Sequence, residues 1–320
     1  MTRITGYVAA TRRQGHLGVH SADHVNLCVP DLSVAEEFYS SFGLDVREEG
    51  SGLGLYTFGN DHRWGSVSEG PHKKLNYLSF GAFEDDIPKF KACLQDNNIK
   101  QIDAPAGMES DGVWFRNFEG TLFEIRVAPK TSPSTKSTID NTSCSPGTMG
   151  ACNRSQAPRV RPRRLAHILV FTSDVEQAIN FYTRIIGLRV SDRSGDGVAF
   201  LHGIHGSDHH LIAIAKSSAP GLHHLSWDLN SINEIGMGAM HMADKGHTRG
   251  WGLGRHVLGS NYFHYIRDPW GSYSEYSSDI DYIPHDMEWE EVDNPPEDSF
   301  YLWGPTPPED FVHNYESEDG

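Results

Sequence analysis

The sequence predicts an α+β protein made of four related strand–helix–strand modules, two in each half of the chain. Three observations predict this fold class. Segments of the two halves align with each other, each aligned segment passes from an apolar strand into a helix with apolar residues three and four apart, and a linker rich in Ser, Thr and Pro separates the halves. Such internal repetition indicates a supersecondary unit that has been copied. A chain of 320 residues also has the length of two domains.

The first pair of repeats opens the two halves. His24–Val46 aligns with His167–Val190, and the identities are spread along both segments. The matched positions are His24 with His167, Asp31 with Asp174, Ala35 with Ala178, Phe38-Tyr39 with Phe181-Tyr182 and, after one inserted residue, Gly43-Leu44 with Gly187-Leu188. Each segment therefore predicts a strand, a capping Ser or Asp, an amphipathic helix and a Gly at the helix end.

A second pair of repeats follows the same rule. Leu75–Phe80 parallels Leu222–Trp227, and Trp114–Glu124 parallels Tyr265–Glu275 with a shared Arg, Gly and terminal Glu. Each half therefore contains two modules.

The net charge of −16 is concentrated at the C-terminal end. Residues 279–320 contain 14 acidic residues and no Lys or Arg. Because acidic surfaces repel phosphate backbones, we expect no nucleic-acid partner. The same segment contains several aromatic residues, so we expect it to pack across the body or on a neighbouring subunit: Trp289, Phe300, Tyr301, Trp303 and Phe311.

The four cysteines predict a reducing compartment. Cys28, Cys93, Cys144 and Cys152 form no CxxC pair and are too sparse for a disulfide framework. The basic opening segment lacks the apolar core of a secretory signal, and no run of about 18 apolar residues is present. We therefore expect a cytoplasmic protein with no membrane association.

Polar residues at equivalent repeat positions differ between the halves. The C-terminal half has His167, His224 and Glu275, whereas the N-terminal half has His24, Tyr77 and Glu124. Replacing the middle imidazole by a phenol removes a good neutral metal ligand. The C-terminal half therefore predicts a metal centre, and the N-terminal half predicts a copy that has lost it.

Two imidazoles and one carboxylate are the ligand set of non-haem Fe(II) oxygenases, which keeps adjacent coordination sites open. His167, His224 and Glu275 lie in apolar runs of period two, so we expect them on one face of a curved sheet. Taken singly, each histidine has the alternative of a satisfied core residue, and Glu275 that of a solvated edge residue. Burying all three without partners would be costly, which favours a metal as the partner.

The C-terminal segment resembles the signature of the type I extradiol dioxygenases of the vicinal oxygen chelate superfamily, in particular the catechol 2,3-dioxygenases (metapyrocatechases). The match consists of Gly254-Arg255-His256, seven residues, His264-Tyr265, two residues, Asp268-Pro269-Trp270-Gly271, three residues and Glu275. One position departs from the pattern, because His264 stands where the signature prefers an aliphatic residue or Phe. The resemblance implies four βαβββ modules that form two domains, each a curved, barrel-like mixed sheet with helices outside.

The resemblance also implies roles for individual residues. His167, His224 and Glu275 match the iron ligands, and His224 lies 51 residues before the Glu as in the family. His223 is then expected on the opposite side of its strand. His210, 14 residues before His224, matches the acid/base histidine, although the register leaves its neighbour His209 as an alternative.

His256 and Tyr265 match the two family residues that hydrogen-bond to the substrate and shuttle protons. Their chemistry fits, because ring cleavage needs an acceptor for a catechol hydroxyl proton and a donor toward charge that develops on oxygen. Each also has a plainer alternative: His210 as a surface strand residue, His256 as a loop residue and Tyr265 as a core residue.

The expected function is therefore extradiol cleavage of a catechol by O2 at Fe(II), giving a 2-hydroxymuconic semialdehyde-type product in aromatic-compound degradation. Plain or alkyl catechols fit the resemblance best, while dihydroxybiphenyl, homoprotocatechuate and trihydroxylated rings stay open. A manganese-dependent version of the enzyme is the first alternative. A glyoxalase-like isomerase or a non-catalytic binding protein of the same fold is a further alternative. The family also implies a homotetramer or larger homo-oligomer.

The expected organisation has five parts. Residues 1–19 form an N-terminal extension, 20–129 a non-catalytic βαβββ pair, 130–162 the linker, 163–282 the catalytic, metal-binding βαβββ pair and 283–320 the acidic, aromatic tail.

Overall fold

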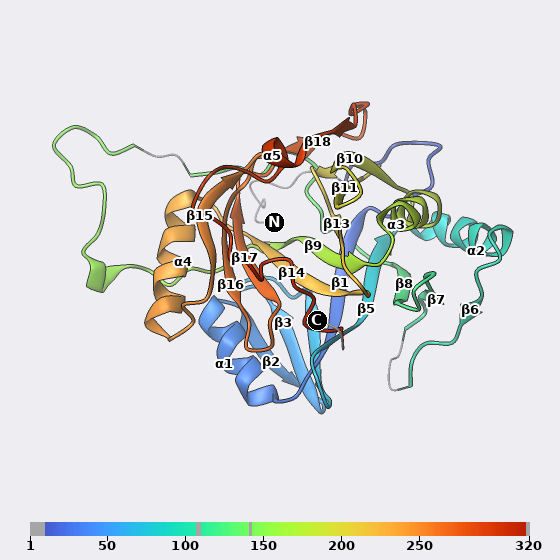
Figure 1. The fold of residues 1–320 in the computed structure, drawn as a ribbon, viewed down its shortest axis with the longest axis horizontal. Helices are drawn as coiled ribbons and strands as arrows, with labels where there is room; N and C mark the ends of the chain where they lie inside the picture. The colour runs from blue at the N-terminus through green and yellow to red at the C-terminus, as the bar shows by residue number, and fades with distance from the viewer. Residues whose placement is uncertain (1–9, 107–109, 141–142, 318–320) are drawn as a thin grey trace, which may run out of the picture.

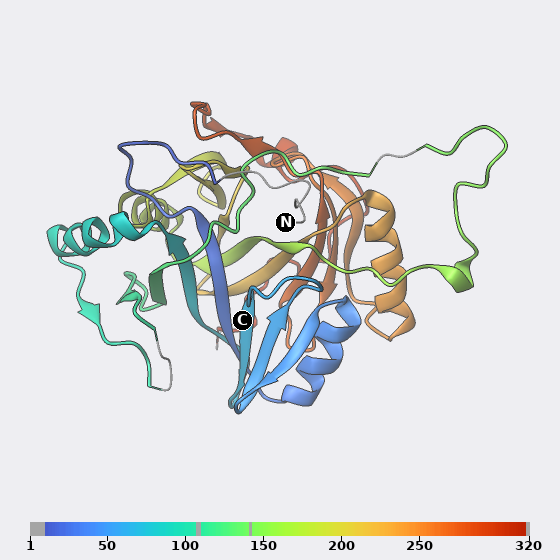
Figure 2. The same ribbon diagram turned by 180° about the vertical axis from the view of Figure 1, so that it is seen from behind.

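The sequence repeats become four βαβββ modules in the computed structural model, which describes residues 10–106, 110–140 and 143–317. Two open, curved sheets lie side by side with helices on their outer faces (Figures 1 and 2). The predicted fold class is confirmed.

The N-terminal half forms an eight-stranded sheet in the order β2-β3-β4-β1-β5-β8-β7-β6. Its first module consists of β1 (Ser21–Val29), α1 (Leu32–Phe42), β2 (Asp45–Glu49), β3 (Gly52–Tyr56) and β4 (Gly65–Glu69). Its second module consists of β5 (Lys74–Ala82), the short 3-10 turn η1 (Glu84–Asp86), α2 (Ile87–Asp96), β6 (Gln101–Ile102), β7 (Val113–Arg116) and β8 (Leu122–Val127).

The C-terminal half repeats this order as β10-β11-β13-β9-β14-β17-β16-β15 and adds one strand of the acidic tail at each edge. Its first module consists of β9 (Arg164–Thr172), α3 (Val175–Phe181), the π-helical turn η3 (Tyr182–Ile186), β10 (Leu188–Ser194), β11 (Val198–Gly203), the short β12 (Ser207–Asp208) and β13 (Ile212–Lys216). Its second module consists of β14 (Gly221–Asp228), α4 (Ile232–Asp244), β15 (Gly250–His256), β16 (Tyr262–Arg267) and β17 (Tyr273–Ser278).

The strand directions repeat in all four modules. The first strand of each module runs parallel to its last strand, in the pairs β1·β4, β5·β8, β9·β13 and β14·β17. The two modules of each half meet through antiparallel first strands, β1·β5 and β9·β14. The first strands of the modules therefore lie at the centre of each sheet.

The helices begin and end where the repeat predicts. Asp31 and Asp174 accept hydrogen bonds from the first-turn N–H groups of α1 and α3. Gly43 (φ 104°) and Gly187 (φ 79°) end the two segments in the left-handed conformation that favours glycine. The one residue inserted in the second copy is accommodated by η3, because a π turn holds one more residue than an α turn.

The two halves share one apolar core. The ring of Tyr276 on β17 stacks on Phe42 of α1 with a centroid distance of 3.9 Å, and its hydroxyl donates to the Phe42 carbonyl at 2.7 Å. The core cluster includes buried aromatic and aliphatic residues of all four modules. The C-terminal half therefore packs directly on the N-terminal half.

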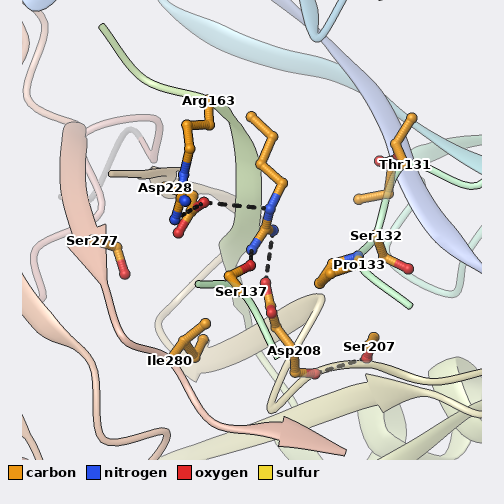
Figure 3. A network of polar contacts seen from close by, with 12 residues as sticks. Thr131, Ser132, Pro133, Ser137, Arg163, Ser207, Asp208, Asp228, Ser277 and Ile280 are labelled. Carbon is orange, nitrogen blue, oxygen red and sulfur yellow. Dashed lines mark hydrogen bonds and ion pairs between the residues drawn. The ribbon is translucent and has the colours of Figure 1, made fainter. Parts of the chain in front are cut away.

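Residues 128–163 connect the halves, with one 3-10 turn, η2 (Arg154–Gln156), in their described part. Part of this linker extends away from the body in both views (Figures 1 and 2), whereas Ser137 is tied to the catalytic half. Arg164 bonds to Ser137 at 3.1 Å and to Asp208 at 2.7 Å, and Arg163 pairs with Asp228 at 2.8 Å (Figure 3). This buried network fixes the strand end that precedes His209 and His210.

The acidic tail lies across the body, which is one of the two placements that the sequence predicted, the other being a neighbouring subunit. It adds β18 (Tyr282–Ile283) to β12, β19 (Val292–Asp293) to β10, the short helix α5 (Pro296–Ser299) and β20 (Tyr301–Trp303) to β15. The segment from β19 to β20 therefore joins the two edges of the catalytic sheet. The domain boundaries stay predictions, and residues 1–9 and 318–320 of the expected terminal segments lie outside the described residues.

Candidate active site

Strand register brings the three predicted metal ligands together. On β14, Ser226 pairs with His167 of β9 on one side and with Glu275 of β17 on the other. His224 lies two residues before Ser226, on the same face of its strand. The Nε2 atoms of His167 and His224 are 3.1 and 3.4 Å from Glu275 Oε2, and the three ligand atoms lie within 4.8 Å of one another.

These three residues fit a divalent transition metal. They are 0–3% exposed, and His224 Nε2 and Glu275 Oε2 make no hydrogen bond within the described part of the chain. Adjacent ligand atoms about 2.1 Å from one ion lie roughly 3 Å apart, close to the observed separations. A buried carboxylate oxygen facing two imidazole nitrogens without bonds of its own is what a cation would satisfy.

His223 does not lie where the sequence predicted it. Leu222 and His224 pair with consecutive residues of β9, so His223 is the extra residue of a β-bulge. The bulge interrupts the alternation of sides, and His223 lies beside His224 with 2.7 Å between their Nδ1 atoms. The expectation that His223 faces the opposite side of the strand is therefore wrong.

The three predicted acid/base residues line the same cavity as His167 and His224, two of the predicted metal ligands. The His210 ring lies 4.1 Å from the His167 ring, and the Tyr265 ring lies 5.1 Å from that of His224. Tyr265 and His256 are joined by a 2.9 Å hydrogen bond between the phenol oxygen and Nε2.

His209, the alternative to His210, does not line this cavity. Its Nε2 bonds to Asp192 on β10 at 2.7 Å, and its Nδ1 faces His210. His210 is thus the histidine of the pair that a bound substrate would meet.

Burial sets the ionisation of these groups. It lowers the pKa of His210, His224 and His256 below that of a free imidazole, so all three are neutral near pH 7. Burial, reinforced by the Glu275 charge, raises the pKa of Tyr265 well above its ordinary value. Burial opposes ionisation of Glu275, yet the neighbouring His167 and His256 hold its pKa below the ordinary value.

The cavity has a volume of about 490 Å³ and a mainly apolar wall. Residues of both the sheet and the tail form that wall: Leu169, Val198, Phe200, Ala215, Leu258, Phe300, Phe311 and Val312. Lys216 also lines it, and its ammonium is paired with Asp196 at 2.9 Å. The polar groups therefore converge on the metal ligands, whereas the rest of the cavity suits an apolar ring.

The tail also bonds to the active-site histidines through its main chain. His256 Nδ1 donates to the Phe300 carbonyl at 2.8 Å, and His223 Nε2 donates to the Phe311 carbonyl at 2.8 Å. Composition and aromatic content predicted that the tail packs on a surface, but no sequence signal identified that surface as the active site.

Comparisons with known proteins agree with this geometry. A model of the Glyoxalase/Bleomycin resistance protein/Dioxygenase superfamily matches residues 164–276, which contain all six predicted site residues. Metapyrocatechase 2 of Cupriavidus necator is 49% identical over 299 residues, 93% of each chain. The chain belongs to the metapyrocatechase family. Metapyrocatechases are extradiol ring-cleaving dioxygenases, so the predicted reaction class is confirmed.

Solved structures share the fold of this metapyrocatechase relative. The 2,3-dioxygenase LapB from Pseudomonas sp. KL28 has a TM-score of 0.70 at 20% identity, covering 89% of this chain and 99% of that chain. The Mn(II)-bound glyoxalase from Novosphingobium aromaticivorans has a TM-score of 0.73 at 24% identity, covering 91% and 93%. At these identities the likeness concerns the fold alone.

No helix in the described ranges is long and apolar enough to cross a membrane.

The N-terminal half of this metapyrocatechase family member holds the equivalent residues in a different arrangement. His24 bonds to Tyr77 at 3.0 Å through Nε2 and to Asp23 at 2.8 Å through Nδ1. Glu124 accepts hydrogen bonds from Ser79 at 2.5 Å and from Ser110. Within the described residues, His167, His224 and Glu275 form the one group that could hold a metal.

Proposed function

We propose that the chain is a catechol 2,3-dioxygenase that binds one Fe(II) through His167, His224 and Glu275. It breaks the ring bond between one hydroxyl-bearing carbon of a catechol and the adjacent unsubstituted carbon, inserts both atoms of O2 at that bond and yields a 2-hydroxymuconic semialdehyde-type product. The observation that carries this proposal is the convergence of three ligand atoms within 4.8 Å, beside a cavity that His210, His256 and Tyr265 line together with His167 and His224.

Bound iron would offer adjacent open positions to the two catechol oxygens and to O2. The protein supplies the proton chemistry. Neutral His210 accepts a proton from a substrate hydroxyl and returns it when negative charge develops on an oxygen of the reacting molecule. Tyr265 stays protonated at neutral pH because its pKa is raised, and its hydroxyl donates to His256 Nε2, since the one N–H of neutral His256 is on Nδ1. The Tyr265 oxygen can therefore accept a hydrogen bond from a substrate hydroxyl while His256 holds it in place.

The cavity wall supports a neutral, apolar-substituted ring as the substrate. Phe200, Phe300 and Phe311 line the cavity with apolar rings. Lys216, the one cation in the wall, is already paired with Asp196. Plain and alkyl catechols therefore rank first, ahead of dihydroxybiphenyl, homoprotocatechuate and trihydroxylated rings.

Manganese is the second candidate metal, because the ligand set suits both metals and a Mn(II)-bound protein shares the fold. A glyoxalase-like isomerase and a non-catalytic binding protein are disfavoured, since neither needs the three acid/base residues. Anaerobic purification with iron and manganese quantitation decides the metal. Oxygen uptake over a catechol panel, with a yellow product, decides the reaction.

Two variants test the assigned roles. His224→Ala is expected to lose metal and turnover together, because one of three ligands is removed. His210→Phe is expected to keep its metal while kcat falls roughly a hundredfold, the usual scale of general acid–base catalysis. Normal turnover of the His210→Phe variant would refute the role of His210.

We also propose that the chain acts in the cytoplasm as a homotetramer or larger assembly. The linker supports this assembly by offering a long exposed surface, in which the Met149 side chain is 80% exposed (Figures 1 and 2). Light scattering of the full chain tests it, and a monomer at micromolar concentration would contradict it.

A further inference from the structure

His210 is held by a chain of buried groups that reaches away from the metal ligands. His209 and His210 are 1% and 3% exposed, and their Nδ1 atoms are 3.1 Å apart. The other ring nitrogen of His209 lies 2.7 Å from Asp192 Oδ2. The His210 side chain lines the cavity that His167 and His224 also line.

The donors and acceptors along the hydrogen-bonded row from Asp192 through His209 to His210 determine which nitrogen carries each hydrogen. An ionised carboxylate only accepts hydrogen bonds, so His209 Nε2 carries the hydrogen that faces Asp192. A neutral imidazole has one N–H, which leaves His209 Nδ1 as an acceptor. The hydrogen between the two Nδ1 atoms therefore belongs to His210, and the Nε2 of His210 presents a free lone pair.

We propose that Asp192 and His209 are positioning residues that fix the ring orientation and the tautomer of His210. This inference rests on the acid/base role proposed for His210. A lone pair on Nε2 is what a base needs when a substrate hydroxyl approaches, so the pair prepares His210 before the substrate binds.

Separate elements hold the positioning pair rigidly. Asp192 Oδ1 accepts from the Val292 N–H of β19 at 3.2 Å. The His209 N–H donates to the Asp281 carbonyl at 2.7 Å, and the Ser191 hydroxyl donates to the His209 carbonyl. The two side chains are therefore fixed by β10 and by the tail, not by their mutual bond alone.

The same arrangement of two adjacent histidines joined through their Nδ1 atoms occurs at His224, the proposed metal ligand. Its Nδ1 lies 2.7 Å from His223 Nδ1, and His223 Nε2 donates to the Phe311 carbonyl at 2.8 Å. A carbonyl, like a carboxylate, only accepts, so the same donor count leaves the lone pair on His224 Nε2, the atom aimed at Glu275. Two adjacent-histidine pairs, each ending on an acceptor, thus present bare Nε2 atoms to one cavity.

Substitutions of equal shape test the proposal. Asparagine at position 209 places an amide oxygen near the position of Nδ1, whereas leucine has nearly the same shape without an acceptor. Both variants lose the bond to Asp192, so a purely structural role predicts equal activity or a small advantage for leucine. We expect kcat to be about tenfold or more lower in His209→Leu than in His209→Asn, with little difference in KM for catechol.

Metal content and a second pair of variants keep the test decisive. Both position-209 variants should hold as much metal as the parent protein. If one fails to fold, Asp192→Asn against Asp192→Leu gives the same comparison, because only the amide oxygen still accepts from His209. His202→Asn is the control, since His202 bonds to Ser191 in the same network but does not contact His210.

The outcomes separate this inference from the proposed function. Equal kcat values for the Asn and Leu variants, together with an impaired His210→Phe variant, would overturn the positioning role alone. A fully active His210→Phe variant would overturn both. A tenfold or larger gap between the Asn and Leu variants at unchanged metal content would support the inference.

Discussion

Asn261 is the residue that orients the metal-binding carboxylate. Its amide Nδ2 donates to Glu275 Oε1 at 3.1 Å and to the Ser277 hydroxyl at 3.0 Å. Glu275 Oε1 is therefore satisfied by a side chain, while Oε2 faces His167 and His224 without a hydrogen bond. This division fixes which oxygen is available to a cation, and such supporting bonds raise metal affinity.

We expect Asn261→Leu to weaken metal binding by about 10–100-fold, the usual effect of losing a supporting bond to a ligand. At saturating Fe(II), kcat should stay much closer to that of the parent, because no group that meets the substrate is changed. Competition with a chelator measures the affinity. Asn26→Leu is the matched control: Asn26 is also buried and bonded to a serine, but lies in the other half. Equal metal affinity in the two variants would refute the role of Asn261.

The sequence predicted six site residues but not the residues that support them, for a physical reason. His167, His224 and Glu275 occupy repeat positions, so the other half of the chain served as a comparison. Asn261 and Asp192 come close to the site only when the chain folds, and no local sequence pattern predicts that packing. His223 was misplaced because a single bulge reverses the side on which a strand residue lies.

At the scale of the element, the distal part of the tail is fixed by an ion pair. Asp310 accepts from Arg267 of β16 at 2.7 Å and from the Tyr315 hydroxyl at 2.8 Å. The hydrogen bond from Arg267 holds the pKa of Asp310 at about 2. The next residue, Phe311, lines the cavity and carries the carbonyl that bonds to His223. The ion pair therefore supports both the cavity wall and the histidine pair.

Asp310→Asn is expected to loosen the tail, with a lower urea midpoint and faster proteolysis of the C-terminal end. The pH dependence follows from the lowered pKa: the ionised carboxylate stabilises the folded state above its unfolded pKa of about 4. This contribution is lost as the pH falls from about 4 to 2. The difference in urea midpoint between parent and variant should thus be constant from pH 8 to 5 and shrink below about pH 4. A difference that grows on acidification would contradict this assignment.

At the scale of the molecule, the repeat predicted the four modules, their order and the functional inequality of the halves. Repeat identities cannot specify how the halves pack, because contacts such as Phe42 with Tyr276 join residues that are not equivalent. They also say nothing of the tail, which has no counterpart in the other half. Two of its strands, β19 and β20, extend the C-terminal sheet at both edges, and only the completed fold shows that the tail crosses the candidate active site.

Two buried glutamates at equivalent repeat positions offer a direct test of the inequality between the halves. Glu275 is 0% exposed and faces two imidazoles, whereas Glu124 is 1% exposed and accepts from Ser79 and Ser110. A glutamine side chain can still accept from one of the two serines and donate to the hydroxyl oxygen of the other, but it lacks the negative charge with which a carboxylate binds a divalent cation. Glu275→Gln should therefore abolish metal retention and turnover, and Glu124→Gln should preserve both.

Elemental analysis after anaerobic loading with Fe(II), combined with oxygen uptake on catechol, measures both effects. The parent and Glu124→Gln should each bind a single equivalent of iron per chain. Both substitutions remove the same charge from a buried position, so a general cost of that change would appear in both variants alike. Two equivalents in the parent would mean that the N-terminal half also binds metal, whereas equal losses of iron in the two variants would show only the general cost of removing a buried charge and would contradict the assignment. The bonds from Ser79 and Ser110 argue against that result, because they already occupy the oxygens that a second ion would need.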